Sequence, residues 1–270
     1  MPKTPLPAIV FVDADAAPGA PPSDRGDRLA GALERLAARR VTIVLCSRRT
    51  RAEFESVRQA LGLFHPFVCE RGAAAYVPER YFGSDLENAR RVGGYQAIEF
   101  GEPYEKVIGT LHRVADRVGL AITGFNDMSV DQVARECGLP LLEARLAKLR
   151  EYRELVRLDA ANPVAERRLV KALESAGLIC TPFGDFHEVG TISDAGGAIA
   201  VISTLYRVAL GAIVTACAGG DEWSAPIAGR VETRLNPPAG DPPDWLESIA
   251  RDMDDIRDAA LARPAARYAR

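Results

Sequence analysis

The stretch AIVFVDADAA, residues 8–17, decides the fold of this chain. It begins with an apolar run from Ala8 to Val12, which is preceded by prolines and followed by two aspartates. A short run without polar alternation predicts a strand that is buried on both faces of a sheet. Asp13 and Asp15 then stand at the end of that strand with one small residue between them. Acids at this place indicate a functional site; capping of a turn is the alternative interpretation.

The segments on either side of the insert described below alternate between helix and strand. Each predicted strand is a continuous apolar run, and each predicted helix has its apolar residues on one face. The expected helices are Arg28–Arg40, Thr50–Leu61 and Gly197–Leu210, and the expected further strands are Val41–Cys46, Pro66–Cys69 and Ala212–Cys217. Buried strands that alternate with helices predict an α/β fold with a Rossmann-like, doubly wound parallel sheet.

The pattern changes in the middle of the chain, where a helix–hairpin mixture interrupts the alternation. The expected elements are a helix at Tyr104–Val118, a strand at Leu120–Gly124, a helix at Val130–Cys137, and a hairpin whose strands are Leu178–Phe183 and Phe186–Val189. We therefore expect a core domain of residues 1–85 plus 190–270, with residues 86–189 forming an inserted α/β cap domain. The charged final helix, from Trp245 on, is expected to be peripheral.

Composition excludes several classes of function. The 270 residues carry a net charge of -3, which gives no reason to expect a nucleic-acid partner. No apolar run approaches the roughly 20 residues of a membrane helix. The N-terminus lacks the pattern of a signal peptide, so a cytoplasmic location is expected. The five cysteines form no CxxC pair and the three histidines lack zinc-ligand spacing, so neither disulfides nor a zinc site are expected.

Three polar positions share one structural location, because each lies at or just past the end of a predicted parallel strand: Asp13, Ser47 and Asp221. Ligands bind at this edge of open α/β sheets, where loops diverge and helix N-termini face the crevice. Helix N-termini favour an anion and aspartates favour a cation, so a phosphate held with Mg²⁺ satisfies both. Ser47 is also a common helix N-cap type, and Arg48 and Arg49 are equally consistent with solvated surface charges.

Four longer runs narrow the interpretation. They are LCSRRTRAEF (residues 45–54), ERGAAAYVP (residues 70–78), GFNDMSVDQVARECGL (residues 124–139) and AKLREY (residues 147–152). The first two resemble the second motif and the E-N-G-A-A segment of the haloacid dehalogenase superfamily of phosphatases, in its mannosyl-3-phosphoglycerate phosphatase branch. The last two resemble the G-F-x-D-M-T and R-E-Y stretches of that branch. The likeness covers nearly the whole chain and implies a C2-type α/β cap inserted in a Rossmann-like core.

The resemblance also implies catalytic roles in the core. Asp13 would be the nucleophile that forms an aspartyl-phosphate, and Asp15 would protonate the leaving oxygen and then activate water. Mg²⁺ would be bound by Asp13, the backbone carbonyl of Asp15, and Asp221. Ser47 would donate a hydrogen bond to a phosphate oxygen.

The resemblance further implies how a substrate is recognised. Arg49 would add an anion contact, and Arg150 and Glu151 of the cap would recognise the glycerate and sugar ends of a small phosphate ester. His187, on the predicted hairpin, is expected to pack within its strand. The oligomeric state is left open between a monomer and a homodimer.

Departures from the family pattern fall in the catalytic motifs. Ala16 and Ala17 replace the Gly and Thr of the D-x-D-G-T motif, and residues 194–198 read DAGGA where the family has a D-K-G-K-A-like run. Ala225 replaces the last acid of the G-D-x-x-N-D motif. Removing one such preorganised group commonly costs on the order of 10²–10³ in rate. Glu222 and Lys148 are the substitutes that the sequence offers.

Two hypotheses therefore stand beside each other. The first is a Mg²⁺-dependent phosphatase acting on a phosphorylated sugar–glycerate, such as mannosyl-3-phosphoglycerate, or on another sugar phosphate. The second is a protein of the same fold that binds a phosphorylated ligand without turning it over, because Ala16, Ala17, Ala195 and Ala225 occupy the positions of working groups. A receiver-type phosphoacceptor domain fits poorly, because such a domain is shorter and has no cap.

Overall fold

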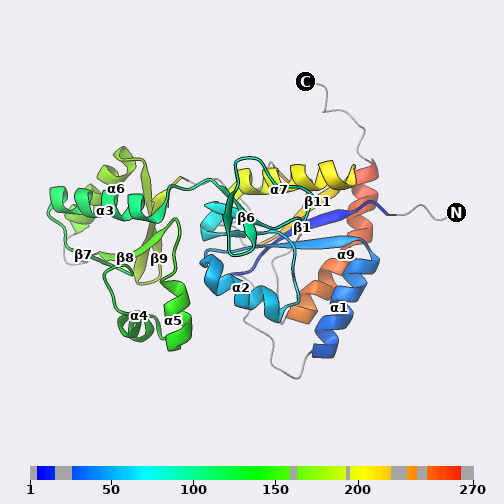
Figure 1. The fold of residues 1–270 in the computed structure, drawn as a ribbon, viewed down its shortest axis with the longest axis horizontal. Coiled ribbons are helices and arrows are strands. Elements are labelled where there is room, and N and C mark those ends of the chain that lie inside the picture. The colour runs from blue at the N-terminus through cyan, green and yellow to red at the C-terminus, as the bar shows by residue number, and fades with distance from the viewer. Residues whose placement is uncertain are drawn as a thin grey trace.

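The computed structural model describes residues 5–15, 26–158, 163–192, 195–219, 230–235 and 242–262. Its strands form two sheets, which lie side by side in Figure 1. The larger sheet has eight strands in the order β12-β11-β1-β2-β3-β4-β6-β5, and the smaller has four in the order β7-β8-β10-β9. The expected α/β class, with a cap inserted in the core, is confirmed.

The decisive stretch forms the strand β1 (Ala8–Asp13), and all six of its residues are buried. β1 pairs in parallel with β2 (Val41–Cys46) on one side and with β11 (Val214–Ala218) on the other. The parallel part of the sheet is completed by β3 (Phe67–Cys69) and β12 (Thr233–Leu235). The ends of β1, β2 and β3 therefore face the same edge of the sheet.

Helices cover both faces of the larger sheet, as Figure 1 shows. The helices α1 (Gly26–Ala38), α2 (Arg51–Ala60) and α9 (Pro242–Ala262) lie on one face, where they pack against Val10 and Val12. The helix α7 (Ala195–Leu210) lies on the other face, against Ile9 and Phe11. Successive side chains of β1 point to opposite faces of the sheet, and helices cover both faces, which explains why the whole strand is apolar.

The expectation that the final helix is peripheral was wrong. Trp245 is only 2% exposed and Leu246 is 0% exposed, and both belong to the main core together with Ile249 and Met253. These apolar residues recur at helical spacing, so that one face of α9 is buried against α1.

The smaller sheet consists of β7 (Ile122–Gly124), β8 (Glu154–Leu158), β9 (Leu178–Phe183) and β10 (Phe186–Thr191). The helices α3 (Tyr104–Val118) and α6 (Pro163–Ser175) pack on one face of it. The helices α4 (Val130–Cys137) and α5 (Leu141–Ala147) pack on the other. Ser129 caps α4, and Gly138 ends it in the left-handed conformation with φ 63°.

The border between core and cap differs from the expected residue 86. The strands β5 (Arg90–Val92) and β6 (Tyr95–Glu99) extend the larger sheet, because β6 pairs antiparallel with β4 (Ala74–Pro78). The chain leaves the larger sheet after Glu99, at the end of β6. It leaves the smaller sheet after Thr191, at the end of β10. The two linkers meet there, since the Glu102 N–H donates to Thr191 Oγ1 at 3.1 Å.

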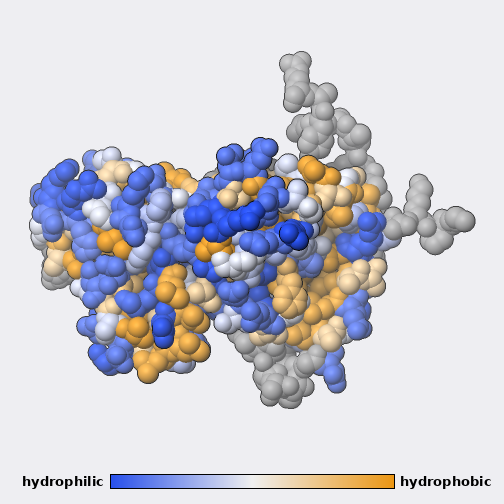
Figure 2. Space-filling view, viewed as in Figure 1, coloured by the Kyte–Doolittle hydropathy of each residue, from blue (hydrophilic) through white to orange (hydrophobic). Residues whose placement is uncertain are grey.

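Apolar side chains gather on the visible face of the cap around α5 (Figure 2). Leu141 and Leu142 on α5, and Leu149 just beyond it, are all exposed. Within the described ranges, no helix combines the length and apolar character needed to cross a membrane. The five cysteines are free thiols.

Candidate active site

A hydrogen bond from main chain to side chain joins Asp13, the last residue of β1, to Asp15. Asp13 is 6% exposed, whereas the side chain of Asp15 is partly open to solvent. The Asp15 N–H donates to Asp13 Oδ1 at 3.0 Å. This bond turns the chain sharply at the end of the strand and holds both carboxylates at one edge of the sheet.

The loop that follows β2 surrounds the Asp15 carboxylate with donors. Ser47 Oγ donates to Asp15 Oδ1 at 2.6 Å, and the Arg48 N–H donates to Asp15 Oδ2 at 2.7 Å. Arg49 Nε lies 3.9 Å from Asp15 Oδ1. We call these three residues, 47–49, the anion loop, because the hydroxyl, main-chain N–H and guanidinium groups that it presents are those that bind carboxylate or phosphate oxygens.

Ser47 is not the N-cap of the helix behind it. Thr50 fills that position and forms a capping box with Glu53. The serine hydroxyl is therefore available to the anion loop, where it also accepts a hydrogen bond of 3.0 Å from the Arg49 N–H. The positive end of the α2 dipole lies directly behind the loop and favours an anion there.

A third turn, η2 (Glu70–Gly72), lies beside the anion loop at the end of β3. All three of its residues have positive φ, with 46° at Glu70, 61° at Arg71 and 88° at Gly72. The Arg71 N–H donates to the Ser47 carbonyl at 3.1 Å. A Cβ on Gly72 would lie 2.5 Å from Ala195 Cα, so this turn packs tightly against the start of α7.

Two arginines of the core reach from this edge to the cap. Arg71 Nη1 lies 3.4 Å from Glu188 Oε2 on β10 and 3.5 Å from Thr181 Oγ1 on β9. The guanidinium of Arg48 lies over the ring of Phe183, 5.1 Å from its centroid. Strands β9 and β10 of the cap therefore lie next to the anion loop.

Glu70 is a buried acid that sequence reasoning did not single out. Its carboxylate accepts hydrogen bonds from the N–H groups of Glu151, Tyr152 and Arg153, at 2.8, 3.0 and 2.7 Å. Burial raises the pKa of Glu70 to about 7, although Arg150 and these three bonds act in the opposite direction. The signal in the sequence that could have identified Glu70 was an acid just after the third predicted strand, two residues before a glycine.

Arg150 lies in the interior between core and cap. It is 9% exposed, its guanidinium lies 5.9 Å from the ring centroid of Phe125, and its Nε and Nη1 atoms have no hydrogen-bond partner among the described residues. Burial lowers the pKa of Arg150, but nearby carboxylates outweigh burial and raise it; they belong to Glu70, Glu53, Glu188 and Glu154.

Glu151 bridges the two domains. Its carboxylate accepts a 2.8 Å hydrogen bond from Arg51 on α2 and another of 2.8 Å from Arg90 on β5. The structure thus brings Asp13, Asp15, Ser47 and Arg49 together, and places Arg150 and Glu151 in core–cap packing. Their contact with a substrate stays a prediction.

Comparison with known sequences identifies the family of this chain. The glucosyl-3-phosphoglycerate/mannosyl-3-phosphoglycerate phosphatase of Methanococcoides burtonii is 31% identical over 224 residues, which are 83% of this chain and 82% of that protein. This chain belongs to the mannosyl-3-phosphoglycerate phosphatase family. The mannosyl-3-phosphoglycerate phosphatase of Pyrococcus horikoshii is 30% identical over 201 residues, 74% of this chain and 78% of that protein. No protein-family model matches the chain.

Two solved structures of haloacid dehalogenase superfamily phosphatases have a similar fold. A phosphatase of that superfamily from Bacteroides thetaiotaomicron aligns with a TM-score of 0.56 at 13% identity, covering 94% of this chain and 96% of the other. A subclass IIB sugar phosphatase aligns with a TM-score of 0.51 at 13% identity, covering 93% and 98%. At this identity the likeness concerns the fold.

Several family motif positions lie outside the described residues, namely Ala16, Ala17, Asp221, Glu222 and Ala225. Ala195 is described, and it lies buried beside Gly72 at a position where the family pattern has a lysine. Lys148 donates to the carbonyls of Phe125 and Met128 inside the cap. His187 lies 3.4 Å from Glu166 on α6, packed within the cap.

The donor chemistry of the site fits Mg²⁺, which prefers oxygen ligands. The two carboxylates at the end of β1 supply such oxygens. The cysteines nearby are protonated thiols: burial, followed by the charge of Asp13, raises the pKa of Cys217 to about 11. Within the described ranges, no group of three or more His, Cys, Asp or Glu side chains is placed to bind a metal ion.

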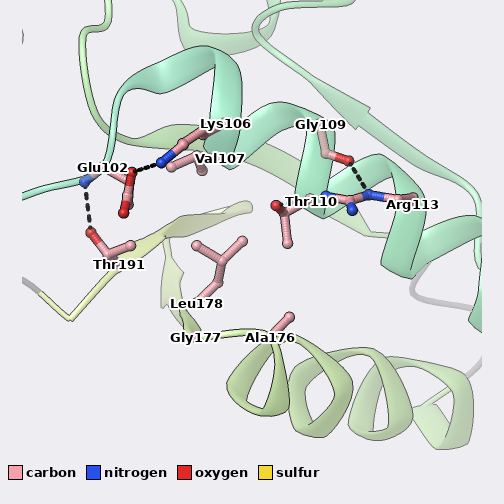
Figure 3. A pocket seen from close by; sticks show the side chains of 10 residues that line it. All are labelled: Glu102, Lys106, Val107, Gly109, Thr110, Arg113, Ala176, Gly177, Leu178 and Thr191. Carbon is pink, nitrogen blue, oxygen red and sulfur yellow. Dashed lines mark hydrogen bonds and ion pairs between the residues drawn. The ribbon is translucent and has the colours of Figure 1, made fainter.

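A separate cavity of 440 Å³ lies in the cap between α3 and the start of β9 (Figure 3). Glu102 and Lys106 stand at one end of it, and Arg113 stands beyond Thr110 at the other. Neither the aspartate pair nor the anion loop lines this cavity. It therefore lies apart from the candidate active site.

Proposed function

We propose that this protein is a phosphatase that hydrolyses a phosphorylated sugar–glycerate, such as mannosyl-3-phosphoglycerate, or another sugar phosphate. The observation that carries the proposal is the junction of the Asp13–Asp15 pair with the anion loop. Two carboxylates and a set of anion donors at one sheet edge match the needs of phosphoryl transfer to an aspartate. The names of the relatives support the substrate class.

In the proposed reaction, an Asp13 carboxylate oxygen attacks phosphorus, and the bond from phosphorus to the ester oxygen breaks. Asp15 gives its proton to the leaving oxygen. Asp15 then takes a proton from water, whose oxygen attacks the aspartyl-phosphate and releases phosphate and free Asp13. The net reaction consumes one water and yields an alcohol and phosphate.

The anion loop would hold the phosphate during both steps. Ser47 Oγ and the Arg48 N–H, which hold the Asp15 carboxylate in this structure, would bind phosphate oxygens, and Asp15 would turn toward the leaving oxygen. Mg²⁺ bound by Asp13, the Asp15 carbonyl and Asp221 would offset the repulsion between carboxylate and phosphate.

The alternative is a protein that binds a phosphorylated ligand without turnover. The buried methyl group of Ala195 favours it, because this side chain supplies no charge at a position beside the η2 turn. The anion loop and the cap would then still bind the ligand.

The deciding experiment measures phosphate release from mannosyl-3-phosphoglycerate and a panel of sugar phosphates, with and without Mg²⁺. Wild type is compared with Asp13→Asn, and with Asp85→Asn as the control, because Asp85 is an exposed acid paired with Arg91. We expect Mg²⁺-dependent release that is lost in Asp13→Asn and kept in Asp85→Asn. Folded protein with no Asp13-dependent release would contradict turnover and leave the binding alternative.

A further inference from the structure

Glu70 connects the core to the cap through main-chain groups. Its side chain is 0% exposed, and its two carboxylate oxygens accept three N–H donors from consecutive residues, 151–153. This segment lies between α5 and β8 of the cap. No side chain of the segment is needed for these bonds, so they fix the path of its backbone.

The same residue contacts the anion loop from the other direction. The Glu70 N–H donates to the Arg49 carbonyl at 3.2 Å, and the next residue, Arg71, donates its N–H to the Ser47 carbonyl at 3.1 Å. One turn therefore contacts both the loop that would hold phosphate and the segment that leads into β8.

The interdomain linkers meet at this point as well. Arg153 Nε donates to the Glu70 carbonyl at 2.9 Å, and Arg153 Nη2 donates to the Thr191 carbonyl at 3.2 Å. Thr191 in turn accepts the N–H of Glu102 from the other linker. Glu70 thus contacts residues 151–153 through its carboxylate, and the two linkers through its main-chain carbonyl and Arg153.

Burial of a carboxylate such as that of Glu70 costs folding free energy unless its hydrogen bonds compensate for the lost hydration. The cost is concentrated at a turn that contacts both the anion loop and residues 151–153. An amide in place of the carboxylate, as in Glu70→Gln, turns one of the two acceptor oxygens into a donor, so at least one of the three main-chain N–H groups loses its acceptor and the segment loosens. These bonds therefore couple the position of the cap to the anion loop.

We propose that Glu70 is a positioning residue, which holds the cap at a set distance from the anion loop through the main chain of residues 151–153. The role rests on the proposed function, since it matters for substrates that contact both the anion loop and the cap. A displacement of the cap by about 1 Å can cost on the order of 10²-fold in the reaction of a substrate held at both ends.

The first test compares two substrates in Glu70→Gln. For mannosyl-3-phosphoglycerate we expect KM to rise roughly 10- to 100-fold, with a smaller change in kcat. For para-nitrophenyl phosphate, which has no sugar for the cap to hold, we expect both constants to change less than about three-fold. Equal losses on both substrates would indicate only a smaller folded fraction and would overturn the proposal.

Glu154→Gln is the matched control. Glu154 is also a buried acid. Its carboxylate accepts hydrogen bonds from the main-chain N–H groups of Phe125 and Asn126 and from the Tyr104 hydroxyl. All of these partners belong to the cap. We expect Glu154→Gln to lower Tm without changing the ratio of KM values for the two substrates.

Hydrogen exchange tests the coupling without any turnover. We expect the amides of residues 151–153 to exchange at least about ten times faster in Glu70→Gln than in wild type, and no such change in Glu154→Gln. Unchanged protection of these amides would overturn the proposal, even in an active enzyme. Faster exchange in a protein without phosphatase activity would contradict the proposed function while supporting the coupling.

Discussion

Ser47 Oγ and Asp15 Oδ1 lie 2.6 Å apart, so that the serine after β2 holds the acid after β1. A hydroxyl that donates to a carboxylate at this distance forms a strong, charge-assisted hydrogen bond. It joins the two parallel strands at the edge where the proposed chemistry takes place.

Ser47→Ala should therefore impair the reaction more than it impairs the fold. The change removes one hydrogen-bond donor to a phosphate oxygen. We expect kcat for phosphate release to fall about 10²–10³-fold, with Tm nearly unchanged. Steady-state kinetics and a thermal melt measure the two effects.

Ser203→Ala provides the comparison for this change. Ser203 is a buried serine on α7 whose hydroxyl has no hydrogen-bond partner within the described part of the chain. Its loss should leave kcat unchanged and Tm equal or higher. If both serine variants lost activity equally, the anion loop would not act as proposed.

Mg²⁺ should stabilise the protein against heat through Asp13. A ligand that binds only the folded state adds about 2.7 kcal/mol at a concentration of 100 Kd. We expect Tm to rise with Mg²⁺ in wild type and in Asp85→Asn, and to rise much less in Asp13→Asn. Chelation with EDTA should reverse the rise and stop phosphate release. An equal rise in all three proteins would place Mg²⁺ elsewhere.

Glu70 should make folding stability depend on pH. Its pKa rises on folding from an ordinary value of 4.5 to about 7, because of burial. Between these values the folded state binds a proton that the unfolded chain releases, so the stability from this group is full below pH 4.5 and is lost as pH rises through 7. The total change is about 3 kcal/mol.

Urea unfolding of wild type and Glu70→Gln at several pH values measures this effect. The difference in unfolding free energy, wild type minus variant, should fall by about 3 kcal/mol between pH 4.5 and pH 8. Parallel curves over this window would show that Glu70 does not titrate there.

Gly72→Ala should destabilise the fold strongly. Gly72 has φ 88°, and a Cβ would lie 2.5 Å from Ala195 Cα. The backbone strain and the forced shift of α7 together should cost about 2–4 kcal/mol. Gly83 has nearly the same φ, 86°, with no described atom within 4 Å of its Cβ position. Gly83→Ala should cost about 1 kcal/mol, and equal losses in urea unfolding would contradict the tight packing of Gly72 on α7.

The strands and helices that follow from the local pattern of apolar residues could be predicted from the sequence. The apolar run before Asp13 and the run before Ser47 became neighbouring parallel strands, because continuous burial leaves few other solutions. Their common edge follows from parallel pairing, so the meeting of Asp15 with Ser47 was predictable as well. Tyr104–Val118, with one apolar face, formed the expected helix.

Other features depend on contacts between distant segments. The burial of Trp245 needs α1 as a partner, and the addition of β6 to the larger sheet needs the exposed edge of β4. The three amides that Glu70 binds lie about 80 residues further along the chain, at sequence separations of 81 to 83. No periodicity in a single sequence shows such a partner.

The position of α9 determines the order in which the chain can fold during synthesis. Arg257 on α9 donates to the Leu6 carbonyl at 2.8 Å, just before β1, and α9 completes the face of the sheet that α1 begins. The cap is one contiguous segment, so all of it has been synthesised before α9. The core cannot complete its packing until α9 is synthesised, because α9 covers part of the β1 face that α1 also covers. A chain that stops before Pro242 should therefore resist protease in residues 104–158 and 163–191, and be cut in the described part of the core.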